Sequence, residues 1–344
     1  MKAFLDTYTP PKMNGEFVGK PIVTVEQFTR CDLDQIFATT HRIRDGVRRD
    51  EQWIHNLCAN KIMATLFFEA STRTDLSFQA AISRLGGRWV GASNGISFSS
   101  LYKGESIADT VRAVGCYADA IILRHPAEGA SYQAAYYLDM LADKIGHKAV
   151  LVSGGDGIGE HPTQALLDLF TIEDAKGGLD NLQITLVGDL KFGRTVHSLA
   201  KLIAIYGGEN ITLTFVSPES LTMPTKVLTF LDGYGIRYRQ TDNLFDVLNN
   251  SDIIYWTRVQ EERFENPAEY EAIRNNFIMT PDLLAQAKPD MCLMHPLPRK
   301  HEMGTEADQD ILDRDPRTCY FHQMENGMFV RMALLAKALG VISL

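Results

Sequence analysis

Four consecutive side chains, Ser71, Thr72, Arg73 and Thr74, could together bind an anion. They follow an apolar run that predicts a buried strand, and they stand where a helical pattern begins. Hydroxyl groups and a guanidinium at a helix start add donors to the free backbone N–H groups and to the positive end of the helix dipole. Phosphate suits that arrangement. Considered alone, so short a run more often caps a helix, with Arg73 as surface charge.

Other polar clusters follow apolar runs in the same way. They are Arg124-His125-Pro126, the segment 188–195 that contains Arg194, Thr257-Arg258-Val259-Gln260, and His295-Pro296-Leu297-Pro298-Arg299. Ligands of parallel α/β sheets collect beyond the carboxyl ends of the strands. We therefore expect all these clusters to converge on one crevice.

The elements that must position these side chains alternate along the chain. Short apolar runs predict buried strands, and periodic stretches predict helices. The predicted strands are 62–68, 120–123, 149–152, 184–187, 213–216, 253–256 and 292–294. The predicted helices include 33–47, 76–85, 107–117, 164–173, 196–205 and 328–339. This alternation predicts an α/β fold with parallel sheets flanked by helices.

The length of 344 residues exceeds what one hydrophobic core usually serves, so two domains are expected. A glycine-rich stretch at 154–159 predicts a break before the next helix. We expect one domain from 1–162, to which the C-terminal helix within 326–344 returns, and a second domain from 163–325. Each domain should carry its own parallel sheet.

The composition is that of a globular protein, with 45% hydrophobic and 22% charged residues. The formal net charge of -9 argues against nucleic acid or an acidic membrane as the main partner, because long-range repulsion would oppose binding. It does not exclude a small anionic substrate. Arginines within about 4 Å of a phosphate outweigh carboxylates beyond the screening length of roughly 8 Å.

The cysteines are scattered, odd in number and never paired as Cys-x-x-Cys, which argues against a disulfide framework or a zinc site. They are Cys31, Cys58, Cys116, Cys292 and Cys319. The N-terminus has no apolar stretch of signal-peptide length, and no run approaches membrane-spanning length. We expect a cytoplasmic protein.

The wider string around the first cluster is more specific than the cluster itself. Phe-Phe-Glu-Ala-Ser-Thr-Arg-Thr at 67–74, followed by Leu-Ser-Phe, resembles the carbamoyl-phosphate signature of the aspartate/ornithine carbamoyltransferase family. Further matches follow in the family's order: Lys-Gly-Glu at 103–105, Arg-His-Pro at 124–126, His-Pro-Thr-Gln at 161–164 and His-Pro-Leu-Pro at 295–298. The resemblance implies transfer of a carbamoyl group from carbamoyl phosphate to an amino acid.

The acceptor half separates the branches of this family. Ornithine enzymes typically carry a cysteine in place of Pro296 and a Ser-Met-Gly motif, and this chain has neither. Arg194, Arg258 and Gln260 resemble the carboxylate-binding residues of the aspartate branch. A dicarboxylate needs two cationic partners, and arginine binds carboxylate bidentately. L-Aspartate is therefore the expected acceptor, giving N-carbamoyl-L-aspartate and phosphate, the committed step of de novo pyrimidine biosynthesis.

The resemblance also implies a role for each matched residue. The phosphate would be held by Ser71, Thr72, Arg73, Thr74 and Arg124. Donors to the carbamoyl oxygen, where negative charge grows during attack, would be Thr74, Arg124 and His161. The carbamoyl NH2 would be received by Gln164 and the backbone carbonyls of Pro296 and Leu297. The aspartate would be bound by Lys103, Arg194, Arg258, Gln260 and Leu297.

In the family, the matching Ser99 and Lys103 reach into a neighbouring subunit's site, which implies a homotrimer with shared active sites. Regulatory chains could join such trimers into a larger assembly. The resemblance implies neither a metal nor an organic cofactor. Glu69 could pair with Arg194 or Arg263 and so hold the two domains closed.

Three departures from the family's pattern qualify this interpretation. Asp75 stands where many members have arginine, and a carboxylate pointing into a phosphate pocket would weaken binding. The chain also has an insertion near 136–148 and a long N-terminal stretch before Thr24. Two alternatives stay open: a carbamoyltransferase with another acceptor, and an inactive member that acts as a scaffold.

Overall fold

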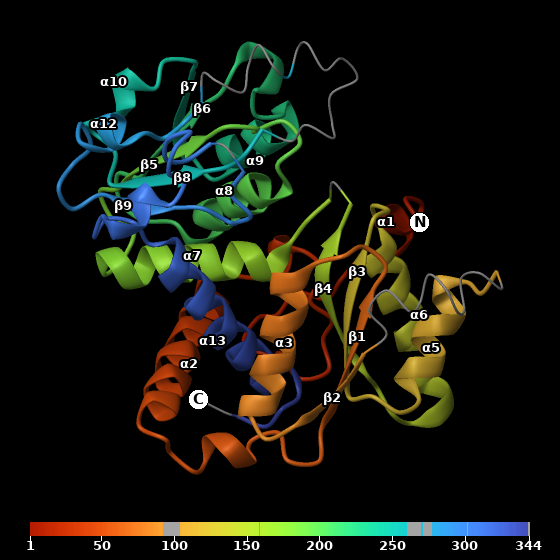
Figure 1. Cartoon of the computed structure of the whole chain (residues 1–344). Helices are drawn as coiled ribbons and strands as arrows, with labels where there is room; N and C mark the ends of the chain where they lie inside the picture. The colour runs from red at the N-terminus through yellow and green to blue at the C-terminus, as the bar shows by residue number, and fades with distance from the viewer. Residues whose placement is uncertain (92–103, 158, 260–269, 271–276, 301, 343–344) are drawn as a thin grey trace. The chain divides into compact units, whose positions relative to one another are not determined.

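The computed structural model describes residues 1–91, 104–157, 159–259, 270, 277–300 and 302–342 (Figure 1). The chain divides into two compact units. Unit 1 contains Met1–Leu167 and Asn326–Leu344, and unit 2 contains Asp168–Glu325. The divisions fall inside two helices, α7 (Pro162–Lys176) and α13 (Tyr320–Ala338). Across these described ranges, no helix combines the length and the apolar character needed to span a membrane.

Unit 1 is built on a four-stranded parallel sheet with the order β2-β1-β3-β4. Its strands are β1 (Ile62–Phe67), β2 (Arg88–Gly91), β3 (Ala120–His125) and β4 (Val150–Asp156). The helices between them are α3 (Thr72–Arg84), α5 (Ile107–Gly115) and α6 (Ala130–Ile145). Figure 1 shows α3 on one side of this sheet and α5 and α6 on the other.

The rest of unit 1 precedes the sheet or closes the chain. It contains α1 (Phe4–Thr7), α2 (Arg30–Arg48), two short 3-10 helices (Val25–Gln27 and Ile54–Asn56) and the C-terminal part of α13. A capping box starts α2, because the Thr29 hydroxyl accepts from the Asp32 N–H and the Asp32 carboxylate accepts from the Thr29 N–H. The core joins both β-strands and helices, and includes Leu66, Val111 and Ile121.

Unit 2 is built on a five-stranded parallel sheet with the order β7-β6-β5-β8-β9. Its strands are β5 (Gln183–Val187), β6 (Thr212–Val216), β7 (Arg237–Thr241), β8 (Ile253–Trp256) and β9 (Cys292–Met294). Its helices include α8 (Arg194–Tyr206), α9 (Thr225–Gly233), α10 (Phe245–Leu248) and α12 (Pro281–Leu284), with short 3-10 helices at Glu219–Leu221 and Ile311–Arg314. Trp256, Met279 and Leu293 lie in its core.

Each sheet has one point where the strand order reverses. In unit 1 the chain runs from β1 outward to β2 and then returns to β3 on the other side of β1. In unit 2 it runs from β5 through β6 to β7 and returns to β8 beside β5. Loops diverge at such a switch point and leave room for a ligand beyond the carboxyl ends of the strands. A ligand is therefore expected to bind at the loops after β1 and β3 in unit 1 and after β5 and β8 in unit 2.

The α/β fold with two parallel sheets is confirmed, and every strand predicted from an apolar run is present. The sequence does not predict β2 or β7. Both are edge strands, and most of their residues are exposed or half-buried. Part of the predicted glycine break belongs to β4, which continues through Gly154 and Gly155 and pairs as far as His125↔Asp156.

The insertion predicted near 136–148 forms the second half of α6 and the turn after it. It packs against the long N-terminal stretch, so that two departures from the family pattern meet in one place. The Phe4 and Tyr136 rings lie 5.5 Å apart, and the Tyr8 hydroxyl donates to Asp139 at 2.7 Å. The insertion therefore has a packing partner within this chain.

Candidate functional site

The helix α3 begins at the predicted anion-binding cluster. Ser71 is its N-cap residue, yet within the described residues its side chain makes no cap hydrogen bond. Thr72 and Arg73 are exposed, whereas Thr74 is buried with 6% of its surface accessible. The cap interpretation is therefore right about position, but the Ser71 hydroxyl and the guanidinium of Arg73 stand where a ligand could use them.

Thr74 and His161 come together from distant parts of unit 1. The Thr74 Oγ1 and His161 Nε2 atoms lie 3.4 Å apart, and both residues are buried. His161 immediately precedes Pro162, the first residue of α7, and Gln164 lies buried in the first turn of that helix. Proline at the first helical position explains the turn, since its missing N–H is not needed there. The turn therefore places His161 and Gln164 together at the start of α7.

Arg124 is placed by an irregularity in the sheet. The register between β3 and β4 shifts between Leu123 and His125, and such bulges redirect side chains near active sites. The Arg124 guanidinium donates to the Gly154 carbonyl at 3.1 Å and pairs with the Glu69 carboxylate at 3.2 Å. Phe68 N–H donates to the Arg124 carbonyl at 2.8 Å, which keeps the loops after β1 and β3 adjacent.

Glu69 pairs with Arg124 within unit 1. The expected pairing of Glu69 with Arg194 or Arg263 stays a prediction. Arg263 lies outside the described residues. Asp75 does not point a lone carboxylate at the cluster, because the Gln79 amide donates to it at 2.7 Å along α3. This contact reduces the conflict between Asp75 and an anion.

His125 follows Arg124 and is held in a neutral form. Burial lowers the pKa of its ring below the usual value. Its Nδ1 atom accepts a hydrogen bond from the Ala127 N–H at 2.9 Å, and its ring lies 5.0 Å from that of Phe68. The residue therefore braces the loop after β3 and is not a further cation in the cluster.

In unit 2, two arginines flank the switch point between β5 and β8. Arg194 is the first residue of α8, and Arg258 follows β8; both are half-buried. The two loops approach closely, because the Thr257 N–H donates to the Val187 carbonyl at 2.8 Å. Gly188 has φ +114°, and a Cβ there would lie 2.2 Å from the Thr257 carbonyl oxygen. Only glycine permits this approach.

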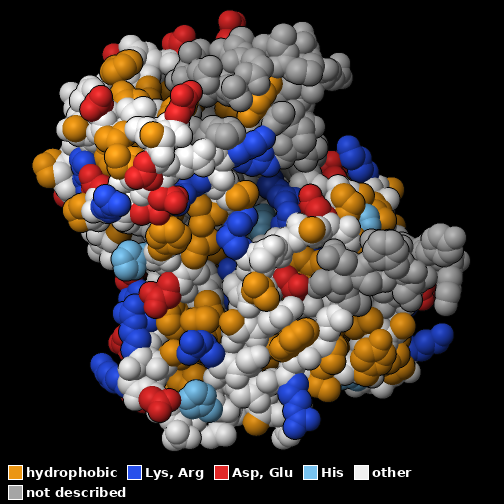
Figure 2. All heavy atoms as spheres, viewed as in Figure 1, with side chains coloured by type: hydrophobic (Ala, Val, Ile, Leu, Met, Phe, Trp, Pro, Cys, Tyr) orange, Lys and Arg blue, Asp and Glu red, His pale blue; other side chains and the backbone are white. Residues whose placement is uncertain are grey.

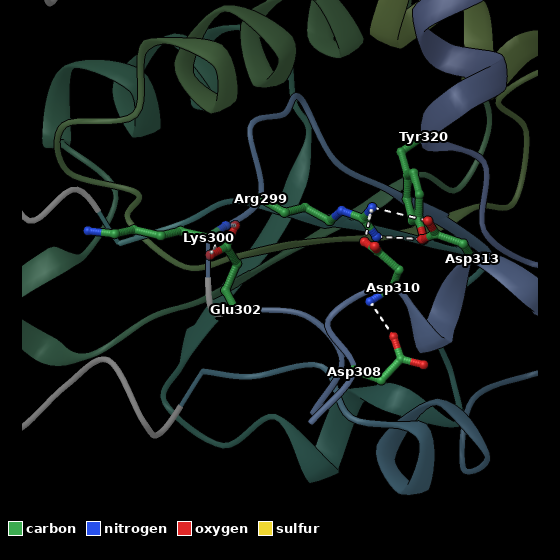
Figure 3. Close-up of polar contacts among 7 residues, drawn as sticks. All are labelled: Arg299, Lys300, Glu302, Asp308, Asp310, Asp313 and Tyr320. Atoms are coloured by element: carbon green, nitrogen blue, oxygen red, sulfur yellow. Dashed lines mark hydrogen bonds and ion pairs between the residues drawn. The ribbon is translucent and has the colours of Figure 1, made fainter. Parts of the chain in front are cut away.

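The loop after β9 carries Pro296 and Leu297, and both are half-buried. Leu297 adopts φ +54°, and the Leu297–Pro298 peptide is cis. Figure 3 shows that Arg299 and Lys300 then point in opposite directions. The Arg299 guanidinium lies 3.1 Å from carboxylate oxygens of both Asp310 and Asp313 and stacks on Tyr320. This end of the loop is firmly anchored.

Several predicted site residues can be placed, and others cannot. Unit 1 brings Thr74 next to His161 and brings Arg124 next to Glu69, which lies just before the Ser71–Thr74 cluster. Unit 2 holds Arg194, Arg258, Pro296 and Leu297 on loops beyond its strands. The predicted residues that lie outside the described residues are Ser99, Lys103 and Gln260.

The cysteine pattern argued against a disulfide framework, yet one pair of cysteines is bonded. Cys292 and Cys319 are bonded, with Cα atoms 6.0 Å apart. The spacing rule considers only cysteines close in sequence, whereas an isolated bridge between Leu293 and Thr318 brings these two segments together. Among the described residues, no group of three or more His, Cys, Asp and Glu side chains could hold a metal ion.

The face drawn in Figure 2 carries both acidic and basic side chains on each unit. The net charge of -9 is therefore not gathered into one patch there. Local arrangement, and not the overall charge, sets the potential at each cluster.

Comparison with known proteins agrees with this geometry. Residues 20–174 match the carbamoyl-P binding domain of the aspartate/ornithine carbamoyltransferases, and residues 180–338 match their Asp/Orn binding domain. The aspartate carbamoyltransferase catalytic subunit of Clostridium botulinum is 44% identical over 324 residues, which cover 94% of this chain and 99% of that protein. The multifunctional protein CAD of Squalus acanthias is also 44% identical, but this chain spans only 14% of its length.

Solved structures give the same result. Aspartate transcarbamoylase from Trypanosoma cruzi, in complex with N-(phosphonacetyl)-L-aspartic acid, superposes with a TM-score of 0.84 at 38% identity, covering 94% of this chain and 97% of that one. The catalytic subunit of M. jannaschii aspartate transcarbamoylase superposes with a TM-score of 0.82 at 36% identity, covering 93% and 98%. The chain thus belongs to the aspartate/ornithine carbamoyltransferase family.

Proposed function

We propose that this chain transfers the carbamoyl group of carbamoyl phosphate to L-aspartate and releases N-carbamoyl-L-aspartate and phosphate. The observation that carries the proposal is the unit 1 cluster, in which His161 contacts Thr74 in the first turn of α3 and Arg124 pairs with Glu69 just before that helix. The relatives named aspartate carbamoyltransferase cover nearly the whole chain. Trypanosoma cruzi structures with carbamoyl phosphate and with carbamoyl aspartate superpose on it. The domain 1–162 plus 326–344 takes carbamoyl phosphate, and the domain 163–325 takes aspartate.

The phosphate group is bound where α3 begins. Ser71, Thr72, Arg73 and Thr74 offer hydroxyl, guanidinium and backbone N–H donors, and the dipole of α3 favours an anion at this end. Arg124 adds a second guanidinium. Because Arg124 already touches Glu69 and the Gly154 carbonyl, its orientation is fixed before a ligand arrives. Preorganised donors of this kind cost no reorganisation when charge develops.

The carbamoyl group is activated by donors to its oxygen and acceptors for its NH2. Thr74, Arg124 and His161 donate to the oxygen as the tetrahedral intermediate forms. Gln164 and the carbonyls of Pro296 and Leu297 receive the NH2. The amine attacks the carbonyl carbon, and the C–O bond to phosphate breaks as phosphate leaves with that electron pair. The departing phosphate is a suitable acceptor for the proton that the amine must lose.

Aspartate is held by its two carboxylates. Arg194 and Arg258 each offer a planar guanidinium that can bind a carboxylate through two parallel hydrogen bonds. Lys103, Gln260 and Leu297 complete this set. Most of the acceleration comes from orientation and fixed electrostatics, because a bound amine held against the carbonyl reacts as an intramolecular neighbour.

The active unit is a homotrimer in which Ser99 and Lys103 complete a neighbour's site. The exposed apolar edge of the unit 1 sheet supports this assembly. Leu76 on α3 is 57% exposed, and Trp89 and Val90 on β2 are each 45% exposed. A partner chain over this edge would bury them. We also propose that regulatory chains join such trimers into a larger assembly and that the protein is cytoplasmic.

A steady-state assay tests the acceptor. Carbamoyl phosphate is offered with L-aspartate or L-ornithine, and phosphate and carbamoylated product are both quantified. We expect equal amounts of phosphate and carbamoyl-aspartate, and no product with ornithine. Arg258→Gln should raise the KM for aspartate while leaving binding of inorganic phosphate unchanged. Turnover with a different acceptor alone would refute the assignment.

The shared site has its own test. Lys103→Ala and Arg73→Ala should each be inactive, and trimers reassembled from a mixture should regain partial activity, because some interfaces then contain neither change. Mixed trimers that stay inactive, although each variant is folded, would show that the subunits do not share a site.

A further inference from the structure

His295 lies at the centre of three hydrogen bonds in unit 2. Its Nε2 atom is 3.0 Å from a Glu302 carboxylate oxygen, its Nδ1 atom is 2.8 Å from the Leu297 backbone nitrogen, and its backbone N–H donates to the Gln323 side-chain oxygen at 3.0 Å. Only 1% of the residue's surface is accessible. Around a buried ring such hydrogen bonds are electrostatically stronger than in water.

These bonds fix the tautomer of the ring. The Leu297 N–H can only donate, so Nδ1 must be the unprotonated acceptor. The proton of a neutral ring then sits on Nε2 and is donated to Glu302. Burial opposes ionisation of Glu302, but the hydrogen bonds from His295 and from the Lys300 N–H lower its pKa below the usual value. A charged carboxylate is the partner that holds the proton on Nε2.

The partners of His295 are themselves anchored. The Glu302 carboxylate accepts a hydrogen bond from the Lys300 N–H at 3.1 Å (Figure 3). The backbone carbonyl of Glu302 accepts another from the Met279 N–H. Gln323, fully buried, donates to Asp168 at 2.6 Å, and Asp168 accepts from the Tyr255 hydroxyl at 2.8 Å. The network therefore ties the loop after β9 to β8, α7 and α13.

The bond to Leu297 determines where a carbonyl points. The peptide between Pro296 and Leu297 is planar, and its C=O and N–H point in opposite directions. A ring that accepts from the Leu297 N–H on one side thus aims the Pro296 carbonyl to the other side. Leu297 also sits at φ +54°, which a β-carbon disfavours and which persists only where surrounding contacts hold it.

We propose that His295, held by Glu302, is a positioning residue that aims the Pro296 carbonyl at the carbamoyl NH2. This inference rests on the function proposed above. His295 touches no substrate in this account. It acts by keeping one peptide plane in the orientation that the reaction needs, and Glu302 acts one step further back by keeping the ring in the right tautomer.

Two substitutions at one position separate positioning from stability. An asparagine side chain can accept from the N–H two residues on, as Nδ1 of His295 does. His295→Asn therefore keeps the Leu297 contact, whereas His295→Leu loses it; both remove the proton donated to Glu302. We expect similar losses of stability in urea. The kcat/KM for carbamoyl phosphate should stay within about threefold of wild type for His295→Asn and fall by about 100-fold for His295→Leu, the scale of a misplaced reacting group.

Glu302 supplies an independent readout. In ¹⁵N-histidine spectra of the wild type, the signals assigned to His295 should show the Nε2–H tautomer. Glu302→Gln keeps an acceptor oxygen for that proton and should keep the tautomer. Glu302→Leu removes the acceptor, so a mixture of tautomers and a lower kcat/KM for carbamoyl phosphate are expected together. Asp313→Asn serves as the control, because it weakens the Arg299 anchor in Figure 3 and does not touch the Pro296–Leu297 peptide.

The outcomes separate this inference from the function it rests on. Folded wild-type protein that makes no carbamoyl-aspartate would refute the proposed function and, with it, the positioning role. An active wild type whose His295→Asn and His295→Leu variants have equal kcat/KM at equal stability would refute the positioning role alone. An Asp313→Asn variant that loses as much kcat/KM as His295→Leu would show that any weakening of unit 2 has the same effect.

Discussion

Replacing Arg124 with methionine tests the electrostatic core of the proposal, because the side chain has a structural and a catalytic task that can be measured separately. Its two described contacts set the structural cost. A hydrogen bond from a charged donor contributes about 1.5–3 kcal/mol. The Glu69 side chain is 39% exposed, so its ion pair counts for about 0.2–1 kcal/mol after screening. Arg124→Met should therefore lower the free energy of unfolding by about 2–4 kcal/mol.

The catalytic cost is of a different size and appears in a different assay. A donor to a developing oxyanion typically contributes about 2.7–4 kcal/mol to the barrier, so kcat/KM for carbamoyl phosphate should fall about 100- to 1,000-fold. Urea unfolding followed by circular dichroism gives the first quantity, and steady-state kinetics at saturating aspartate gives the second. A folded Arg124→Met protein whose kcat/KM lies within tenfold of wild type would refute the assigned role.

Glu69→Gln is the matched control, because the amide leaves the Arg124–Gly154 contact in place. Its free energy of unfolding should change by less than about 1 kcal/mol. Removing the competing carboxylate should tighten binding of inorganic phosphate by at most about fivefold, measured by calorimetry. Weaker phosphate binding in this variant would contradict the competition between Glu69 and an anion for Arg124.

Other predictions concern single residues. Burial raises the pKa of the Cys58 thiol to about 12, so alkylation of native protein at pH 8 should label exposed Cys31 and Cys116 and spare Cys58, as peptide mass spectrometry can check. Labelling of Cys58 at the same rate would contradict its burial. The pKa of His125 is lowered, so the unfolded chain binds its proton more readily and the free energy of unfolding should fall as pH drops from about 7 to 5. The asparagine of His125→Asn can still accept a hydrogen bond from the Ala127 N–H, so the free energy of unfolding of this variant should depend less steeply on pH. An unchanged dependence on pH would exclude His125 as its cause. Trp89→Asp should convert the proposed trimer to monomers in light scattering, and an unchanged mass would place the interface elsewhere.

The sequence predicts the elements whose neighbours cover both faces. Strands β1, β3, β5 and β8 appear as apolar runs because helices bury them on both sides. The edge strand β2, with Trp89 and Val90 at 45% exposure, has no such signal. The pairing of β2 with β1 depends on backbone hydrogen bonds and on what covers this edge of the sheet. A local hydrophobic pattern in the sequence indicates neither.

The candidate site divides in the same way. The matched motifs identify Thr74, Arg124 and His161, because each lies in a short string that can be compared. The sequence does not predict that Glu69 pairs with Arg124 or that Cys292 meets Cys319, since both contacts depend on which strands become neighbours. Register and strand order are properties of the whole sheet, so a scan along the chain does not contain them.

The His295 network shows why such contacts matter for function. His295-Pro296-Leu297-Pro298 would be a rigid loop on the strength of its prolines alone, yet proline leaves the direction of the Pro296–Leu297 peptide unspecified. That direction is set by a ring nitrogen whose protonation depends on Glu302, seven residues away, and by an amide of Gln323, 28 residues away. The residues that contact a ligand can thus be found in motifs, whereas the residues that aim them are found only once the chain is folded. Apolar substitutions at Glu302 and Gln323, which remove the hydrogen-bonding groups, should therefore lower carbamoyl phosphate turnover although neither residue lies in any of the matched motifs.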